Sequence, residues 1–436
     1  MLESFTQGKL PESWTVQSGD WRVENARLDV DSMQGEAFLT FGDATWQNYE
    51  VELKFCFEEV ANPSRWMSLL LRTNHDGDGS WYQVPVRLHA RQENGVELAY
   101  RTPMNFWEVS RKQRGLENCE LGKPRVLKVR VEGARIKVWL DGNVVLEDTF
   151  VTDQELGCLG LGASGCRGYF DDLQVTLLNE TPRLSQAELP SVENVAHRGF
   201  SFKAPENTLA AIREAIDSGA SGCEFDVMGS KDGRVILMHD RTLDRTTDGS
   251  GQVSALSLTE LQQLDAGSWK AAKYSSETVP TLEQALELLR GTNCQPVIEI
   301  KDDRVAARVA EIVRELDMVD DVAVIAFGQA AIKTVRRLEP KIQCAWLHGK
   351  EVPGSLNDQV AWLVKQAESC NVKTLDLNYK LLTPELVAAL KDRGYKVWTW
   401  TVDRPGAMRE LRHRGVDSIT TNRPDVLQGQ LQNASE

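Results

Sequence analysis

The hydrophobic pattern changes its period partway along the chain, and this change limits the fold more than any other feature of the sequence. Before about residue 180, apolar residues alternate with polar ones, as in YEVELKFCFEEV at 49–60. A period of two is typical of half-buried antiparallel strands. After about residue 190, short apolar runs alternate with amphipathic helical stretches, which is typical of βα units around a parallel sheet. The 436 residues therefore hold domains of two different classes.

Residues 1–180 are predicted to form a β-sandwich. RVLKVRVEGARIKVWLDGNVVLEDTF, starting at Arg125, gives three strands with turns at Glu132–Gly133 and Asp141–Asn143. LGASGCRGYFDDLQVTLL at 161–178 resembles the closing strands of laminin-G-like and concanavalin-like jelly rolls. Two interpretations of this domain stay open. Exposed tryptophans such as Trp81 or Trp107 could bind a glycan or another polymer. Alternatively, the aromatic residues form the core and the domain only stabilises or dimerises the protein, which we favour because aromatic residues dominate sandwich cores.

The second half is predicted to be a (β/α)₈ TIM barrel. TPRLSQAELP, residues 181–190, is polar and aperiodic and is the expected linker. Residues 191–428 then hold some eight strands alternating with helices, which fits a closed barrel better than an open sheet. Residues 429–436 are expected to be a frayed tail.

One junction departs from the βα pattern. In EFDVMGSKDGRVILMHD, starting at Glu224, only a KDG turn separates two strands. This turn is far too short for a crossover helix, so the two strands must be antiparallel neighbours. The hairpin brings His239, after the second strand, close to Glu224 and Asp226 on the first.

Reactive side chains gather at the predicted strand ends, where barrels of this type keep their chemistry. In chain order the ends carry His197 and Arg198 (first strand), Glu224 and Asp226 (second), His239 and Asp240 (third), Glu299 and Lys301 (fourth) and Trp400 (eighth). Three carboxylates in one mouth repel one another unless a cation lies among them. Oxygen ligands without Cys or His suit one Ca²⁺ or Mg²⁺, or Mn²⁺, rather than Zn²⁺. Two histidines and two basic side chains beside such a cation indicate a site for a phosphate diester.

Eight short motifs across the second half resemble those of one known family. In order they are AHRG (196–199), PENT (205–208), E-x-D (224–226), HD (239–240), RTT (245–247), PTLE (280–283), EIK (299–301) and WTV (400–402). Their order and spacing over about residues 192–425 are similar to those of the glycerophosphodiester phosphodiesterases. The resemblance implies the barrel of the phospholipase-C-like phosphodiesterases, with a small helical insertion at about 240–294 that caps the mouth.

The resemblance also implies roles for individual residues. Glu224, Asp226 and Glu299 would be the metal ligands, and His197 and His239 the acid–base pair. Arg198 and Lys301 would contact the phosphate, although each could instead form only an ion pair. Trp269 in the insertion is a candidate lid residue, while Trp400 is equally suited to the barrel core and to a substrate-contacting wall. One departure is Asn422, where the family usually ends its last strand in Asp.

The implied reaction is hydrolysis of a glycerophosphodiester to a glycerol phosphate and an alcohol. One imidazole would take a proton from the vicinal glycerol hydroxyl or from water, and the other would protonate the leaving alcohol. Two alternatives stay open: headgroup cleavage like that of sphingomyelinase D or lysophospholipase D, and a non-catalytic protein that binds polyol or glycan phosphates. The second ranks low because both histidines and all three carboxylates are present.

Composition excludes several other classes. A net charge of −14 argues against a nucleic-acid partner, which needs a basic face. No apolar run approaches the roughly 18 residues of a transmembrane helix, and the first residues lack the features of a signal peptide. The chain as written is therefore expected to be cytoplasmic, or extracellular or at the cell surface if it is a mature form. The 8 cysteines are too sparse for a disulfide scaffold and are expected to be free and buried.

Overall fold

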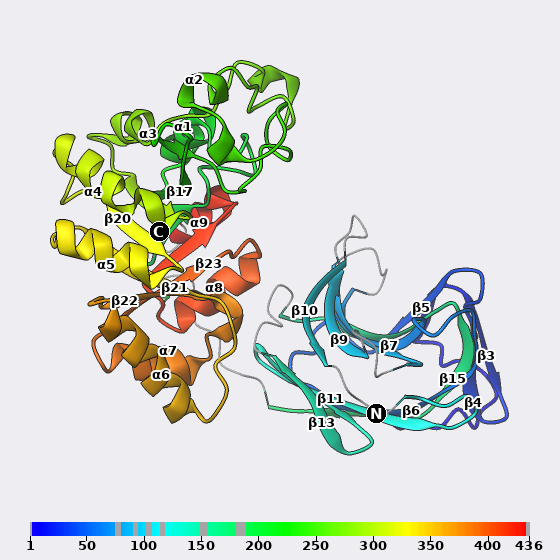
Figure 1. Cartoon of the computed structure of the whole chain (residues 1–436). Coiled ribbons are helices and arrows are strands. Elements are labelled where there is room, and N and C mark those ends of the chain that lie inside the picture. Colours follow the sequence, from blue (N-terminus) through cyan, green and yellow to red (C-terminus); the bar gives the residue numbers. More distant parts are fainter. Residues whose placement is uncertain are drawn as a thin grey trace. The chain divides into compact units, whose positions relative to one another are not determined.

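The computed structural model describes residues 2–74, 80–89, 95–101, 107–113, 118–148, 155–179 and 189–432. The chain divides into two compact units, Met1–Arg183 and Leu184–Glu436; Figure 1 draws both. Most of the linker predicted at 181–190, up to residue 188, lies outside the described residues, as do residues 433–436 of the predicted tail.

The first unit consists of two antiparallel sheets, as expected for a β-sandwich. One has the order β13 (Asn143–Asp148), β12 (Arg135–Leu140), β11 (Arg125–Glu132), β6 (Tyr49–Val60), β15 (Cys166–Leu177), β4 (Arg27–Asp31) and β3 (Asp20–Glu24), with β1 (Leu2–Glu3) paired to β15. The other has the order β10 (Trp107–Gln113), β9 (Val96–Arg101), β8 (Trp81–Arg87), β7 (Trp66–Thr73), β14 (Cys158–Ser164), β5 (Glu36–Phe41) and β2 (Thr15–Ser18).

Strand alternation builds the core of this unit. On β6, Tyr49, Val51, Leu53, Phe55 and Phe57 are all buried in the core between the sheets, as their spacing predicts. The three strands predicted after Arg125 are β11, β12 and β13, joined by two short turns.

The tryptophans fit neither interpretation of the sandwich completely. Trp14 and Trp21 belong to the core. Trp81 is buried, with 7% exposure, rather than exposed. However, Tyr82, Val84 and Val86 are the residues of β8 that face the core, so alternation places Trp81 on the opposite face of the seven-stranded sheet.

The second unit contains a closed barrel of eight parallel strands. They are β16 (Glu193–Ala196), β17 (Gly222–Gly229), β19 (Gln295–Ile300), β20 (Ala323–Ala326), β21 (Gln343–His348), β22 (Thr374–Asn378), β23 (Lys396–Trp400) and β24 (Ser418–Thr421). Pairing of β16 with both β24 and β17 closes the ring. Apolar side chains from several strands, including Val297, Ile325 and Leu347, form a buried cluster.

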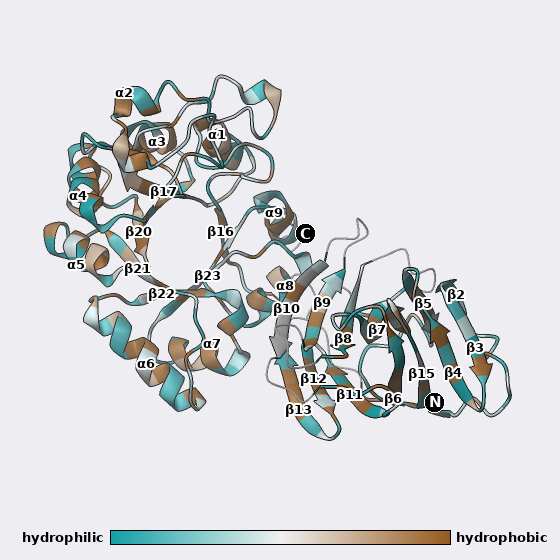
Figure 2. Ribbon diagram, turned by 45° about the vertical axis from the view of Figure 1, so that its right-hand side comes forward, coloured by the Kyte–Doolittle hydropathy of each residue, from teal (hydrophilic) through white to brown (hydrophobic). Residues whose placement is uncertain are grey.

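Helices surround this ring of strands, as Figure 2 shows. They are α1 (Leu209–Asp217), α3 (Leu282–Leu289), α4 (Ala306–Glu315), α5 (Gln329–Leu338), α6 (Leu356–Ser369), α7 (Pro384–Lys391), α8 (Pro405–His413) and α9 (Pro424–Gln432). In the described part of the chain, no helix is both long and apolar enough to cross a membrane. All eight cysteines are buried and free, as expected.

The predicted hairpin is present. β18 (Val235–Leu237) pairs antiparallel with the end of β17, and the register joins Val227 to Leu237. In the described part of the chain, β17 is the only strand that pairs with β18, apart from an isolated bridge between Ile236 and Thr281. Since β18 lies outside the closed ring, it is not the third barrel strand that the sequence suggested. Trp400 is consequently on the seventh barrel strand, β23, rather than the eighth.

The stretch after β18 folds around its own small core. It holds the 3₁₀ turns η2 (Val253–Ala255) and η3 (Ala272–Tyr274) and the short helix α2 (Leu258–Leu261). Leu243, Val253, Leu261 and Val279 pack together with Met238 in this core. The following helix, α3, packs against α1 and belongs to the layer of barrel helices.

Candidate active site

The loop after β16 carries two of the predicted site residues, His197 and Arg198, at the mouth of the barrel. Arg198 has a φ of 57° and Gly199 a φ of 76°, so the chain turns sharply behind His197. A Cβ atom on Gly199 would lie 2.5 Å from the carbonyl carbon of Ala211 in α1. The AHRG motif therefore needs glycine at this position both for the turn and for close packing on the helix.

Three buried carboxylates meet beside this turn. Glu224 and Asp226 are two residues apart on β17 and share one face of the strand. The parallel register pairs Asp226 with Glu299 on β19. Oxygen atoms of all three carboxylates lie within 4.8 Å of one another, and the residues are only 1%, 0% and 7% exposed.

These carboxylates do not ionise alike. Burial, together with the charges of Asp226 and Glu299, raises the pKa of Glu224 well above its usual value. Burial and the charge of Asp226 raise the pKa of Glu299 to about 7. Burial opposes ionisation of Asp226 too, but Lys301 and Arg198 outweigh it and lower the pKa of Asp226. Glu224 and Glu299 thus lack enough positive charge nearby to stabilise their ionised forms.

A divalent cation fits this arrangement. Oε1 of Glu224 is buried and has no hydrogen-bond donor within the described residues, although such atoms normally have a partner. The donor set is entirely oxygen, as Ca²⁺ and Mg²⁺ prefer. A cation bound among the three carboxylates would offset the repulsion that raises the pKa values of Glu224 and Glu299.

Arg198 and Lys301 supply the positive charge next to the carboxylates. Nε of Arg198 lies 3.2 Å from Oδ2 of Asp226. Nζ of Lys301 lies 3.2 Å from Oδ1 of Asp226 and 2.6 Å from Oε1 of Glu299. Both cations pair with carboxylates in this structure, and both lie at the mouth where an anion could reach them.

The two histidines have different partners. Nδ1 of His197 lies 2.7 Å from Oδ1 of Asn422, whose Nδ2 donates to Asp403 at 2.7 Å. The amide orientation makes Nδ1 the protonated nitrogen of His197 and leaves Nε2 free, 4.0 Å from Oε2 of Glu224. Burial and the charge of Arg198 lower the pKa of His197 to about 4, so its imidazole is neutral near pH 7.

His239 instead lies against a carboxylate. Its Nδ1 is 2.6 Å from Oδ1 of Asp240. Arg245 donates to both oxygens of Asp240 and lowers the pKa of that carboxyl. Arg245 also contacts Glu206, which pairs with Arg198 at 2.7 Å. An ion-pair network thus joins the surroundings of His239 to Arg198.

Some of these supporting residues were not foreseen. The sequence suggested that Asn207 caps α1, but Thr208 is the cap and accepts from the amide of Ala211. Asn207, with a φ of 58°, instead donates to Oδ2 of Asp226 and accepts from its backbone amide. Its position in the PENT motif was the available signal. No signal in the sequence indicated Asp403, apart from its place directly after the WTV motif.

The two candidate tryptophans lie in different settings. Trp400 is half-buried, packs against the barrel's apolar cluster and meets Phe327 edge to face at 5.5 Å between ring centroids. Its Nε1 donates to the carbonyl of Asp376. Trp269 is 41% exposed and bonds through Nε1 to the carbonyl of Ala266. Its neighbour Lys270 reaches the carbonyl of Ser201, near His197.

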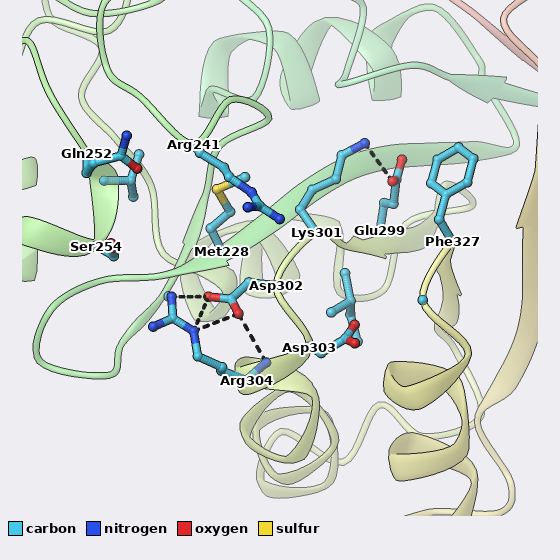
Figure 3. A pocket seen from close by; sticks show the side chains of 14 residues that line it. Met228, Arg241, Gln252, Ser254, Glu299, Lys301, Asp302, Asp303, Arg304 and Phe327 are labelled. Carbon is cyan, nitrogen blue, oxygen red and sulfur yellow. Dashed lines mark hydrogen bonds and ion pairs between the residues drawn. The ribbon is translucent and has the colours of Figure 1, made fainter.

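A cavity of about 580 Å³ adjoins Glu299 and Lys301. Figure 3 shows these two side chains at one side of it, with Gln252 and Ser254 toward the other. The carboxylate cluster therefore borders a space that can hold a bound molecule.

Comparisons with known proteins agree with this geometry. Residues 197–426 match the glycerophosphoryl diester phosphodiesterase family. A glycerophosphodiester phosphodiesterase of Caldanaerobacter subterraneus subsp. tengcongensis is 33% identical over 240 residues, 53% of this chain and 95% of that protein. One of Bacillus subtilis is 29% identical over 254 residues, 53% of this chain and 84% of that protein. An Oleispira antarctica phosphodiesterase, solved in complex with the product sn-glycerol-3-phosphate, has a TM-score of 0.51 and 31% identity, covering 56% of this chain and 97% of that one.

Proposed function

Because the chain belongs to the glycerophosphoryl diester phosphodiesterase family, we propose that its barrel hydrolyses glycerophosphodiesters. Water and the diester would give a glycerol phosphate and a free alcohol. The observation that carries the proposal is the cluster of three buried carboxylates on β17 and β19, whose oxygens lie within 4.8 Å of one another, beside His197 and His239. Glycerol phosphate is the product bound to the Oleispira antarctica relative.

Glu224, Asp226 and Glu299 would hold one divalent cation, Mg²⁺ or Ca²⁺, with Mn²⁺ as a further candidate. When bound, the cation would offset the charge that develops on the phosphoryl oxygens. Arg198 and Lys301 would then contact the phosphate, since the cation takes over their role beside the carboxylates.

The hydrogen bonds of the two histidines suggest separate roles. His197 is neutral and has Nε2 free, so it would accept the proton of the vicinal glycerol hydroxyl or of water. Nδ1 of His239 can donate to Asp240, as expected of a general acid that a carboxylate orients. His239 would therefore protonate the alcohol oxygen as its bond to phosphorus breaks.

Release of glycerol phosphate from a panel of glycerophosphodiesters, with and without chelator, tests this function. We expect release from the full chain, its loss on chelation, and its return on adding Mg²⁺ or Ca²⁺. His197→Ala and His239→Ala should each abolish turnover while the barrel stays folded. Cleavage of sphingomyelin or lysophospholipids but not of small diesters would favour the headgroup-cleaving alternative, and binding without turnover would favour the non-catalytic one.

We further propose that the seven-stranded sheet binds a neutral sugar or polyol on the face opposite its core. Buried polar atoms on that face, Ser68 Oγ, Gln83 Nε2 and Arg101 Nη1, have no hydrogen-bond partner within the described residues. Arg101 lies over the ring of Trp81, 5.2 Å from its centroid. Arg101 pairs with Glu36, at 2.8 Å, so the face offers little net charge there. Aromatic rings beside unpaired polar groups suit a ligand with hydroxyl groups and apolar ring faces.

Affinity electrophoresis of the full chain through neutral and anionic polysaccharides tests this second function. We expect a neutral polysaccharide to retard the chain and Gln83→Ala to remove the retardation. Trp139→Ala, on the other sheet at β12, is the control. Retardation by anionic polymers alone, or by none, would contradict it.

A further inference from the structure

The cavity beside Glu299 and Lys301 extends well beyond the candidate catalytic residues. Its walls come from the end of β17, from the segment after β18 with η2, and from the segments that follow β19 and β20. Its volume of about 580 Å³ is within the range of roughly 300–1,000 Å³ for pockets that take drug-sized ligands. A three-carbon glycerol arm would leave much of this space empty.

The charged side chains in this cavity are mostly paired with one another. Arg304 forms an ion pair with Asp302, with 2.7 Å between Nη2 and Oδ2. Lys301 forms one with Glu299, with 2.6 Å between Nζ and Oε1. Among the described residues that line the cavity, Arg241 and Asp303 are the two charged side chains without an ion pair. The cavity therefore offers a ligand one positive and one negative group.

Arg241 and Asp303 come from different walls. Arg241 stands two residues after His239 along the chain. Figure 3 shows its side chain among those that line the cavity. Asp303 begins η4 (Asp303–Val305), two residues after Lys301. Met228 and Phe327 add apolar surface to the lining of the cavity.

We propose that this cavity binds the alcohol arm of the diester and selects arms that carry both a carboxylate and an ammonium group. The carboxylate would face Arg241 and the ammonium Asp303, because each would then gain a charge-assisted hydrogen bond. This inference rests on the proposed phosphodiesterase function. Glu299 and Lys301, which line the cavity, connect it to the carboxylate cluster.

Steady-state kinetics on three small substrates test the inference. Glycerophosphoserine carries both charges on its alcohol, glycerophosphoethanolamine carries only the ammonium, and glycerophosphoglycerol carries neither. We expect Arg241→Ala to lower kcat/KM about tenfold for glycerophosphoserine alone. Asp303→Asn should lower it by a similar factor for glycerophosphoserine and glycerophosphoethanolamine. Neither variant should change kcat/KM for glycerophosphoglycerol.

Lys231→Ala is the matched control, because Lys231 is an exposed cation on the nearby β17–β18 turn and does not line the cavity. Equal losses on all three substrates, or unchanged selectivity in both variants, would overturn the selectivity while leaving the phosphodiesterase function intact. If the unaltered chain cleaves none of the three, the proposed function itself fails.

Discussion

At the scale of single residues, the site depends on carboxylates that are buried, although burial favours their neutral forms over their ionised forms. Burial raises the pKa of Glu224 and Glu299, so their ionised forms destabilise the cation-free protein. A group whose folded-state pKa is raised stabilises the fold below that pKa and loses this contribution as pH rises through it. A bound cation reverses the balance, since it favours the ionised forms.

Glu224→Gln should separate stability from cation binding. Gln keeps an oxygen that can accept from the amide of Arg198, now 2.8 Å from Oε2 of Glu224, but it removes a buried charge. At pH 8 without cations we expect stability to rise by about 1 kcal/mol, or roughly 2–4 °C in melting temperature. Adding Mg²⁺ should raise the melting temperature of the unaltered chain and not that of the variant. If Mg²⁺ raises the melting temperature of the variant as much as that of the unaltered chain, Glu224 is not a cation ligand.

Cation affinity should depend on pH with a defined sign. The pKa of Glu299 is raised to about 7, so below pH 7 a cation must displace a proton to bind. We expect the dissociation constant for Mg²⁺ or Ca²⁺ to rise about tenfold or more from pH 8 to pH 6, because binding weakens. Calorimetry in two buffers of different ionisation enthalpy would also detect the released proton. Equal affinity and no proton release would contradict this account.

Sequence reasoning found the reactive residues better than the residues that support them. The histidines follow β16 and β18, Glu299 is near the end of β19, and Glu224 and Asp226 share one face of β17. Strand period, strand order and the hairpin turn are enough to predict these positions. Asn207 was assigned to a helix cap because Asn is a common cap, yet it binds Asp226. The choice between these roles depends on a tertiary contact across 19 positions, which no local pattern encodes.

At the scale of elements, the turn between β16 and α1 leaves no room for a side chain at Gly199. Gly199→Ala would add a Cβ atom 2.5 Å from the Ala211 carbonyl carbon at a φ of 76°. We expect a loss of more than about 2 kcal/mol in unfolding free energy, and a fall in activity as His197 and Arg198 shift. Chemical denaturation measures the first effect and turnover the second.

Gly233→Ala is the matched control for this substitution. Gly233 has a φ of 79°, but a Cβ atom there would meet nothing within 4 Å. Its substitution should cost only about 1 kcal/mol and leave turnover unchanged. Equal costs at both positions would mean that packing against α1 does not constrain the AHRG turn.

Local turn chemistry explains which elements could be predicted. The KDG turn required an antiparallel hairpin, and β18 pairs with β17 as expected. The turn alone does not determine whether β18 is a barrel strand, because that depends on whether a further barrel strand pairs with the other edge of β18. Similarly, alternation on β8 separates Trp81 from the core residues, but which face is the core depends on the second sheet.

At the scale of the whole molecule, the candidate catalytic residues all lie in the second unit, Leu184–Glu436. Each unit has its own apolar core, so we expect the barrel to fold without the sandwich. Residues 188–436 should hydrolyse small glycerophosphodiesters with nearly the kcat of the full chain. The sandwich should matter only on polymeric or surface-bound substrates, through tethering. A large loss of kcat on a small substrate, in a truncated protein shown by circular dichroism to be folded, would place part of the active site in the sandwich.

The most direct test of the central claim is a parallel titration of the cation-free full chain with Mg²⁺ or Ca²⁺, following binding by calorimetry and release of glycerol phosphate by assay. We predict that both titrations give the same midpoint with one cation per chain, and that Asp226→Asn removes both. Full turnover by protein whose metal content is negligible by elemental analysis would show that the three carboxylates do not act by holding a cation.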